Sequence, residues 1–392
     1  MAAYPQEMSR FIHSRYALVP LYISWASWQA FTFLHYGVSP GGDTVRYVNA
    51  AHRIQDGLLP TGKALSYLSY DYFVALIFML GENLLFVAIA QVLVSGIALY
   101  GLFRIGEILF SRTVGWLAGL LYAAYPEFAY WNSVIYTDAF YTSVLIIAVW
   151  RILFSKTAPQ FIFAIALVLI AGLARPHGLG FLSVMILYGF CNLVRGKQYL
   201  ILAITSAVLL FSTPVLWQAL GTMSAYETLV RHYQDGTVIW GYAEADIPVD
   251  SEQSDFSSSY SHPMVNLAAY VLEYPARVSQ LAAHKLGYFF SHMRPYYANY
   301  HNLLSVVYLF PCYLFAVLGA YIARPSIPCS RSLLLGIPFA QTVIVSASFA
   351  DWDGRHVIPI LPWIFLLAAS GLMSMVKHIK LWKGRGKIPA TP

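Results

Sequence analysis

The sequence predicts an all-α membrane protein, a helical bundle of about ten transmembrane helices with two long outer loops that carry interfacial helices. Of the 392 residues, 58% are apolar and only 11% are Asp, Glu, Lys or Arg, whereas soluble domains are about 25% charged. Apolar stretches recur along the chain, and 29 Tyr and 10 Trp residues suit aromatic belts at two membrane surfaces. The net charge of +6 fits basic loops at an anionic leaflet, so nucleic-acid binding is not expected.

A helix needs about 20 mainly apolar residues to cross a hydrocarbon core. Ten segments meet or approach this length, and we expect them to form one transmembrane domain over residues 1–392. The ten segments are 16–36, 84–103, 114–130, 134–154, 160–174, 178–194, 199–220, 303–323, 332–350 and 357–376.

The charges indicate how the chain is oriented, because Lys and Arg collect on the cytoplasmic side of membrane proteins. If the N-terminus is inside and the spans alternate, 15 of the 24 basic residues fall inside, whereas only Glu7 and Glu107 of the 18 acidic residues do. We therefore expect a multi-pass protein with both termini cytoplasmic and a basic cytoplasmic tail at 377–392. This pattern fits a bacterial inner membrane whose outer loops face the periplasm.

Two outer segments, 37–83 and 221–302, are long enough to carry function. The second begins with an acidic stretch, 235–255, which reads as a mobile lid, and continues through 264–290 with the apolar spacing of an interface helix. The acidic stretch lacks the ligand spacing of a calcium loop, so a solvated lid is the preferred interpretation.

The three cysteines, Cys191, Cys312 and Cys329, have no paired spacing. Neither a disulfide framework nor a zinc site is therefore expected from them.

Four ionisable residues stand out because charge at a helix mouth in a membrane is costly. Asp43 follows two glycines after the first span, Asp138 lies one turn inside the fourth, Arg175 separates the fifth and sixth, and Arg355 precedes the last. Each has a structural alternative: a helix N-cap for Asp43, a hydrogen-bonded Asp138, a snorkelling Arg175, and an internal Asp to Arg pair for Arg355. Their shared placement at the outer mouth of the bundle favours a site.

Sugar transfer from a lipid phosphate would use this set of residues. Cations neutralise the departing phosphate, and one carboxylate takes the proton of the acceptor hydroxyl. Asp43 would be the base, and Arg175, Arg355 and Lys63 would bind the donor phosphate. A single displacement of this kind inverts the anomeric centre. No cofactor is required and no metal ligand is assigned, although a divalent cation is compatible with the scheme.

The chain resembles the GT-C superfamily of membrane glycosyltransferases, in particular bacterial relatives of the protein O-mannosyltransferases and the lipid A aminoarabinose transferase. The likeness lies in short motifs spread over most of the chain. They are Gly42-Asp43 with Tyr47, Ala50 and Gly57; the run from Ser66 through Gly81; Arg104, Phe110, Arg112, Pro126, Ser133 and Asp138; Ala174 to Gly178; and Arg355 to Pro359 with Pro362.

The resemblance implies that Asp43 is the catalytic base and that Asp138 helps to form the catalytic cavity. Basic residues would bind the carrier phosphate, and Tyr47, His177 and His356 are expected to line the substrate cavity. Two motifs differ from the family pattern: Thr44 stands where many relatives have Glu, and Ala64 follows Lys63 where they have Pro. Many relatives also have a large outer C-terminal domain, which is not expected here.

The donor is expected to be a polyprenyl-phosphate sugar, and the acceptor a lipid, glycan or protein. One alternative is a polysaccharide ligase with a diphosphate-linked carrier, which could use His177, His292 and Arg294. Another is a transporter or flippase of a lipid-linked solute, which predicts ionisable residues at the bilayer midplane. A structural scaffold would leave the converging charges unexplained.

Overall fold

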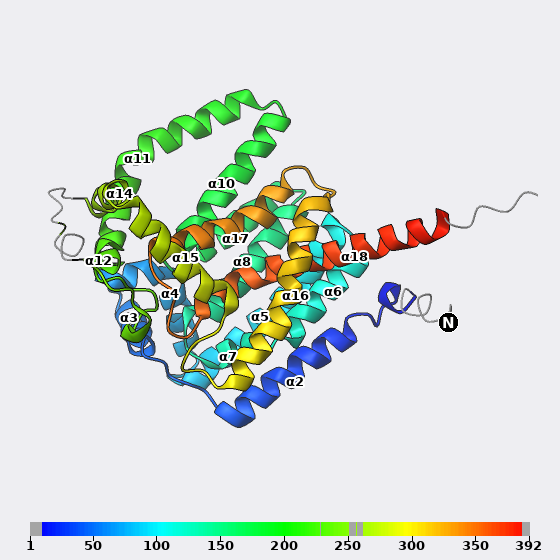
Figure 1. Ribbon diagram of the computed structural model, residues 1–392, viewed down its shortest axis with the longest axis horizontal. Coiled ribbons are helices and arrows are strands. Elements are labelled where there is room, and N and C mark those ends of the chain that lie inside the picture. Colours follow the sequence, from blue (N-terminus) through cyan, green and yellow to red (C-terminus); the bar gives the residue numbers. More distant parts are fainter. Residues whose placement is uncertain (1–9, 228, 251–255, 257–261, 386–392) are drawn as a thin grey trace, which may run out of the picture.

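The computed structural model describes residues 10–227, 229–250, 256 and 262–385, and this part of the chain is built from helices (Figure 1). Within it, extended structure is limited to two isolated bridges, Ser39 with Val134 and Ile239 with Ala350. The predicted all-α polytopic bundle is confirmed. The α-helices are α2 (Val19–Tyr36), α3 (Thr44–Gln55), α4 (Leu68–Phe78), α5 (Leu84–Leu109), α6 (Arg112–Ala124), α7 (Pro126–Ser133), α8 (Thr137–Phe154), α9 (Ala158–Gly172), α10 (Gly178–Arg195), α11 (Tyr199–Glu227), α12 (Leu229–Gln234), α14 (Pro263–Glu273), α15 (Pro275–Ser291), α16 (Asn299–Ile322), α17 (Ser330–Ala347) and α18 (Leu361–Arg385). The 3-10 helices are η1 (Gly62–Tyr67), η2 (Ala243–Ala245) and η3 (Arg355–Ile360).

Six helices in the described part are long and apolar enough to cross a membrane, so the protein is an integral, multi-pass membrane protein. They are α5, α8, α10, α16, α17 and the continuous segment of η3 and α18. The other predicted spans are also helical, but α9 has only 15 residues and α2 has 18 of lower hydropathy. The total of ten spans remains a prediction.

Prolines divide two segments that the sequence pattern presents as continuous. Pro126 is the first residue of α7, so the predicted span 114–130 is wrong: α6 ends at Ala124 and a short helix follows. Pro275 opens α15 in the same way, so the predicted interface helix 264–290 is two helices, α14 and α15. Proline lacks the N–H that a helix interior needs but fits the first turn, so each marks a restart.

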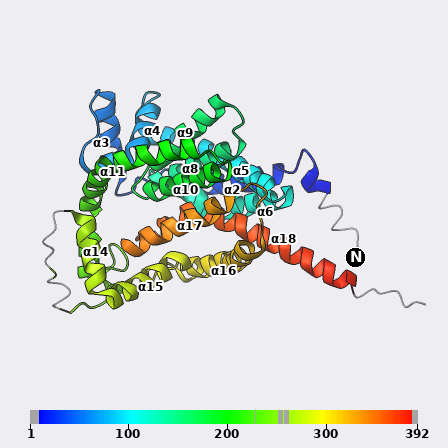
Figure 2. The same cartoon turned by 90° about the horizontal axis from the view of Figure 1, so that it is seen from above.

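The two long outer segments lie at the same end of the bundle, on opposite sides of it. Figure 2 shows α3 and α4 on one side and α14 and α15 on the other. The second segment has a small core of its own, made by Tyr233, Val238, Ile239, Leu267, Tyr270, Leu281 and Ala350. The backbone of Ala350 joins this core to the loop before η3, because its N–H donates to Val238 O and its carbonyl accepts from Trp240 N.

A disulfide joins Cys191 at the end of α10 to Cys329 before α17. The expectation of no disulfide is therefore wrong. The two cysteines are 138 positions apart in the sequence, so only the packing of α10 against α17 reveals the pair. The end of α10 is also the end that the charge pattern assigns to the cytoplasm, where disulfides are rare.

Two predicted segments are described only in part. Helix α18 continues to Arg385, so the predicted tail starts as a helix, and residues 386–392 lie outside the described residues. Of the predicted acidic lid, residues 251–255 also lie outside them.

Candidate active site

The four ionisable residues singled out in the sequence meet at the end of the bundle that carries the two long segments. Asp43 directly precedes α3, and Asp138 lies in the first turn of α8. Arg175 lies between α9 and α10, and Arg355 is the first residue of η3. Their side chains form one connected set of ion pairs.

Backbone contacts with the segment before α8 hold Asp43 in place. Ser39 N donates to Ser133 O at 3.0 Å, and Ile135 N donates to Ser39 O at 3.2 Å. Gly41 is needed here because a Cβ would come within 2.5 Å of the Tyr136 ring. The Asp43 N–H faces the Tyr136 hydroxyl at 3.4 Å. Although Asp43 occupies the N-cap position of α3, its side chain makes no capping hydrogen bond, so the carboxylate is left for ion pairs.

Arg355 pairs with both aspartates of the ion cluster. Its Nη1 lies 3.3 Å from Asp43 Oδ2 and 3.9 Å from Asp138 Oδ2. Its Nε donates to Asp351 Oδ2 at 2.7 Å, so the internal Asp to Arg pair considered from the sequence is present beside the longer-range pairs. The guanidinium also lies 4.6 Å from the centroid of the Tyr136 ring, which stabilises a cation.

The two aspartates of the cluster differ in exposure. Asp138 is paired with Arg175, and both side chains are buried, at 1% and 6% exposed. The Asp43 side chain is 31% exposed, although it pairs with Arg355 and, at 3.3 Å, with Arg46 Nη1. Asp43 is therefore the more accessible carboxylate of the two, whereas Asp138 is buried beside both guanidiniums.

The loop that carries Arg355 is held by Arg294. This buried arginine donates from Nη2 to Asp351 O at 2.7 Å and from Nε to Trp352 O at 3.2 Å. Asp353, in the same loop, has its pKa raised to about 6 by burial and by the nearby Asp351 carboxylate. The loop thus has a defined position and carries a carboxyl group that titrates near neutrality.

The other predicted site residues have varied surroundings. His177 and His356 are buried with ring centroids 4.5 Å apart, and the Gln341 amide lies 3.0 Å from His177 Nδ1 and donates to His356 O at 3.0 Å. Tyr47 is buried and accepts a hydrogen bond from Arg46 Nη2 at 3.0 Å. Their place in a substrate cavity remains a prediction. Lys63 lies in η1, and its contact with a phosphate also remains a prediction.

An apolar groove of about 760 Å³ lies between α4, α5, α8 and α9, and the four residues of the ion cluster are not among its lining residues. Phe140 and Leu173 line it, and each is two residues from a member of the cluster, Asp138 or Arg175. Trp150 lies at its far end, so the groove follows α8 for about 15 Å at 1.5 Å per residue. Its lining is almost entirely apolar.

Two residues of this region were missed in the sequence. Arg46 pairs with Asp43 and lies over the Tyr67 ring, with 4.2 Å to its centroid; its position three residues after Asp43 on a helix was the available signal. Asp71 on α4 is buried, and neither of its carboxylate oxygens has a hydrogen-bond partner within the described structure. Burial raises its pKa to about 8, and Arg46 opposes that rise in part.

Residues 68–217 match the family described as dolichyl-phosphate-mannose-protein mannosyltransferase. The predicted resemblance to the GT-C membrane glycosyltransferases is confirmed. The matched residues are thus similar to a family of membrane glycosyltransferases over 68–217.

Among solved structures, the chain is similar to the archaeal oligosaccharyltransferase AglB from Archaeoglobus fulgidus, in complex with an inhibitory peptide and a dolichol-phosphate. The identity is 13% and the TM-score 0.45, over 97% of this chain and 53% of that one. The chain thus spans about half of the length of this relative. No curated protein sequence matches the chain significantly.

Proposed function

We propose that this enzyme transfers a sugar from a polyprenyl-phosphate carrier to an acceptor hydroxyl at the outer, periplasmic face of a bacterial inner membrane. The observation that carries the proposal is the ion pair of an accessible carboxylate, Asp43, with the Arg355 guanidinium, in a protein that also has an apolar groove between α4, α5, α8 and α9. A lipid phosphate needs these three features together: a cation for the phosphate, a groove for the tail, and a base for the acceptor.

The reaction is a single displacement. The acceptor oxygen attacks the anomeric carbon while the bond from that carbon to the phosphate oxygen breaks, and the electron pair leaves with the phosphate. The proton of the acceptor hydroxyl moves to the Asp43 carboxylate. Because one face of the sugar is attacked and the other face loses the phosphate, the product has the inverted configuration.

The guanidiniums stabilise the phosphate as it leaves. Arg355 is the better placed, since its side chain is 18% exposed and stacked on Tyr136. The Nη1 of Arg175 is paired with Asp138. Its buried Nε has no hydrogen-bond partner within the described structure and is available to donate to a phosphate oxygen. Such charge-assisted bonds are about twice as strong as neutral ones, and they make protonation of the leaving group unnecessary.

The ligase with a diphosphate-linked carrier has weaker support. It needs additional cations, but the donors of Arg294 are used by backbone carbonyls of the 351–352 loop, and His177 is buried against His356. A transporter would need ionisable groups along a path, whereas those of the cluster gather at one end of the bundle. The sugar, the carrier length and the choice of lipid, glycan or protein acceptor are left to experiment.

The test is release of polyprenyl phosphate by the purified protein from a panel of polyprenyl-phosphate sugars, with a membrane extract as acceptor source. We expect one donor to be turned over and the product to have the inverted configuration. Turnover of a diphosphate-linked donor alone would favour the ligase, and retention of configuration would exclude the single displacement.

A further inference from the structure

A second group of polar side chains lies near the Arg355 loop and has no role in the proposed sugar transfer. Glu127 comes from the first turn of α7, His292 ends α15, and His301 lies in the first turn of α16. One ligand atom from each lies within 4.8 Å of the others. Glu127 Oε1 is 3.4 Å from His301 Nε2, and Glu127 Oε2 is 3.8 Å from His292 Nε2.

No hydrogen bond explains why the His292 side chain is buried. Its side chain is 1% exposed, and neither ring nitrogen has a hydrogen-bond partner within the described structure. The 3.8 Å separation from Glu127 is too long for a hydrogen bond. Its backbone is also in the left-handed region, with φ +54°, which is uncommon for a residue other than Gly. A buried imidazole without a partner is costly, and a metal ion would satisfy it.

The ligand atoms are close enough to share one ion, since one atom from each residue lies within 4.8 Å of the others. Zinc binds imidazole nitrogen and carboxylate oxygen at about 2.0–2.2 Å, which separates neighbouring ligands by roughly 3.4 Å. The 3.4 Å separation of Glu127 Oε1 from His301 Nε2 agrees with this value, and the His292 ring, 3.8 Å from the other oxygen of Glu127, would move closer on binding. Two imidazoles and one carboxylate suit zinc, whereas calcium and magnesium prefer oxygen ligands.

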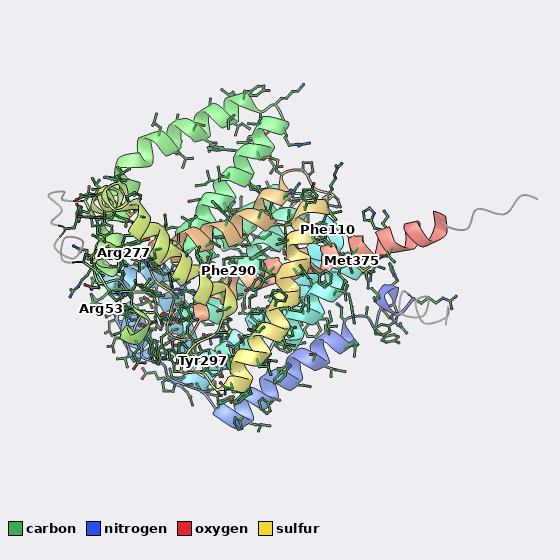
Figure 3. The ribbon with its side chains drawn as sticks, viewed as in Figure 1. Arg53, Phe110, Arg277, Phe290, Tyr297 and Met375 are labelled. Atoms are coloured by element: carbon green, nitrogen blue, oxygen red, sulfur yellow. A yellow bond between two sulfur atoms is a disulfide. The ribbon has the colours of Figure 1, made fainter. Side chains whose placement is uncertain are left out.

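We propose that Glu127, His292 and His301 form a zinc site with a fourth position open to water. The proposal does not depend on the identity of the sugar donor. The site would join α7, which precedes Asp138 in the chain, to the segment 292–301 between α15 and α16. Figure 3 marks this segment at Tyr297, whose ring lies 4.4 Å from that of His301.

The same segment holds the Arg355 loop. Arg294, two residues after His292, binds the carbonyls of Asp351 and Trp352, and Tyr296 donates to Trp352 O at 2.6 Å. Gly354 is so close to His292 that a Cβ there would lie 2.7 Å from Nδ1. A zinc ion bound here would therefore fix the loop that positions Arg355, without touching the substrate.

The experiment measures zinc in the full-length protein, purified in detergent, stripped with a chelator and then equilibrated with zinc alone. We expect about one zinc per chain and a higher melting temperature with zinc than without it. Glu127→Gln and His301→Ala should bind zinc on the order of 100-fold more weakly, since each loses a direct ligand. His301→Cys, which keeps a zinc ligand, should retain binding and shows that a loss in His301→Ala is not caused by misfolding.

The matched control is His52→Ala. His52 Nδ1 lies 3.8 Å from Glu82 Oε1 in an exposed pair outside the three-residue group, so its loss should leave zinc binding unchanged. Calcium and magnesium should not compete for the site. Absence of zinc from the wild type after equilibration, or equal zinc content in wild type, Glu127→Gln and His301→Ala, would overturn the proposal.

Discussion

Among the described residues, two clusters of charged side chains at opposite ends of the bundle are built differently. Away from the candidate active site, Glu107 pairs with Arg104 at 2.9 Å and with Arg112 at 3.0 Å, all within nine residues of sequence. These side chains are 26–33% exposed, and they stabilise the turn between α5 and α6. Figure 3 marks this end at Phe110 and the opposite end at Arg53.

The active-site cluster joins residues 43, 138, 175 and 355 and is mostly buried. Local exposed pairs cost little to form and contribute about 0–1 kcal/mol, whereas buried charges are expensive to desolvate and seldom increase stability. A chain keeps such a cluster only if the charges serve another purpose. The contrast between the clusters is therefore an argument for function at residues 43 to 355 and for structure at residues 104 to 112.

The largest difference should appear when one carboxylate is removed from each cluster. Asp138→Asn leaves Arg175 buried without a counter-charge, which costs about 3–5 kcal/mol and should abolish turnover. Glu107→Gln removes a half-exposed partner and should cost less than about 1 kcal/mol, with turnover unchanged. Thermal unfolding in detergent and donor turnover measure both variants. Equal effects of the two substitutions on stability and turnover would contradict the functional difference between the two clusters.

Asp71 sharpens the comparison because it is a buried carboxylate without a strong ion pair. Its folded pKa of about 8 lies above the usual value of 3.8, so its contribution to stability is fully present below about pH 4 and is lost as pH rises through 8. Asp71→Asn should remove this loss, so the melting temperature of the variant relative to the wild type should be higher above pH 8 than at pH 5. If the difference in melting temperature between wild type and variant were the same at pH 5 and at pH 8.5, the assignment would be contradicted.

The Cys191–Cys329 disulfide is expected to have little effect on turnover. Cys191 lies 13 residues along α10 from Gly178, or about 20 Å from the active-site end at 1.5 Å per residue. Reduction, or Cys191→Ser, should lower the melting temperature and leave turnover within about twofold, because the bridge constrains mainly the unfolded chain. If this end faces the cytoplasm, both thiols should react with a maleimide in intact cells. A bridge that persists in cells would contradict the orientation predicted from the charges.

The sequence predicts which residues meet where topology alone decides it. Spans that alternate across a membrane place Asp43, Asp138, Arg175 and Arg355 at one end whatever their packing, and the structure brings them into contact. Contacts that depend on packing are not visible in the sequence. The Cys191–Cys329 bridge needs α10 beside α17.

The proposed zinc ligands cannot be recognised in the sequence for the same reason. The group joins Glu127 to two histidines more than 160 positions away, without a ligand spacing that a sequence motif could reveal. The breaks at Pro126 and Pro275 were open to prediction, since both prolines are visible, but the surrounding apolar residues favoured continuous helices.

The central claim is that Asp43 takes the proton of the acceptor, and Asp43→Asn tests it most directly. Asparagine keeps the shape of the side chain and removes the base, and Asp56→Asn, an exposed residue at the other end of α3, is the matched control. We predict that Asp43→Asn lowers donor turnover by about 10²–10⁴-fold with an unchanged melting temperature, while Asp56→Asn behaves as wild type. Turnover by Asp43→Asn within a few fold of wild type would contradict the account.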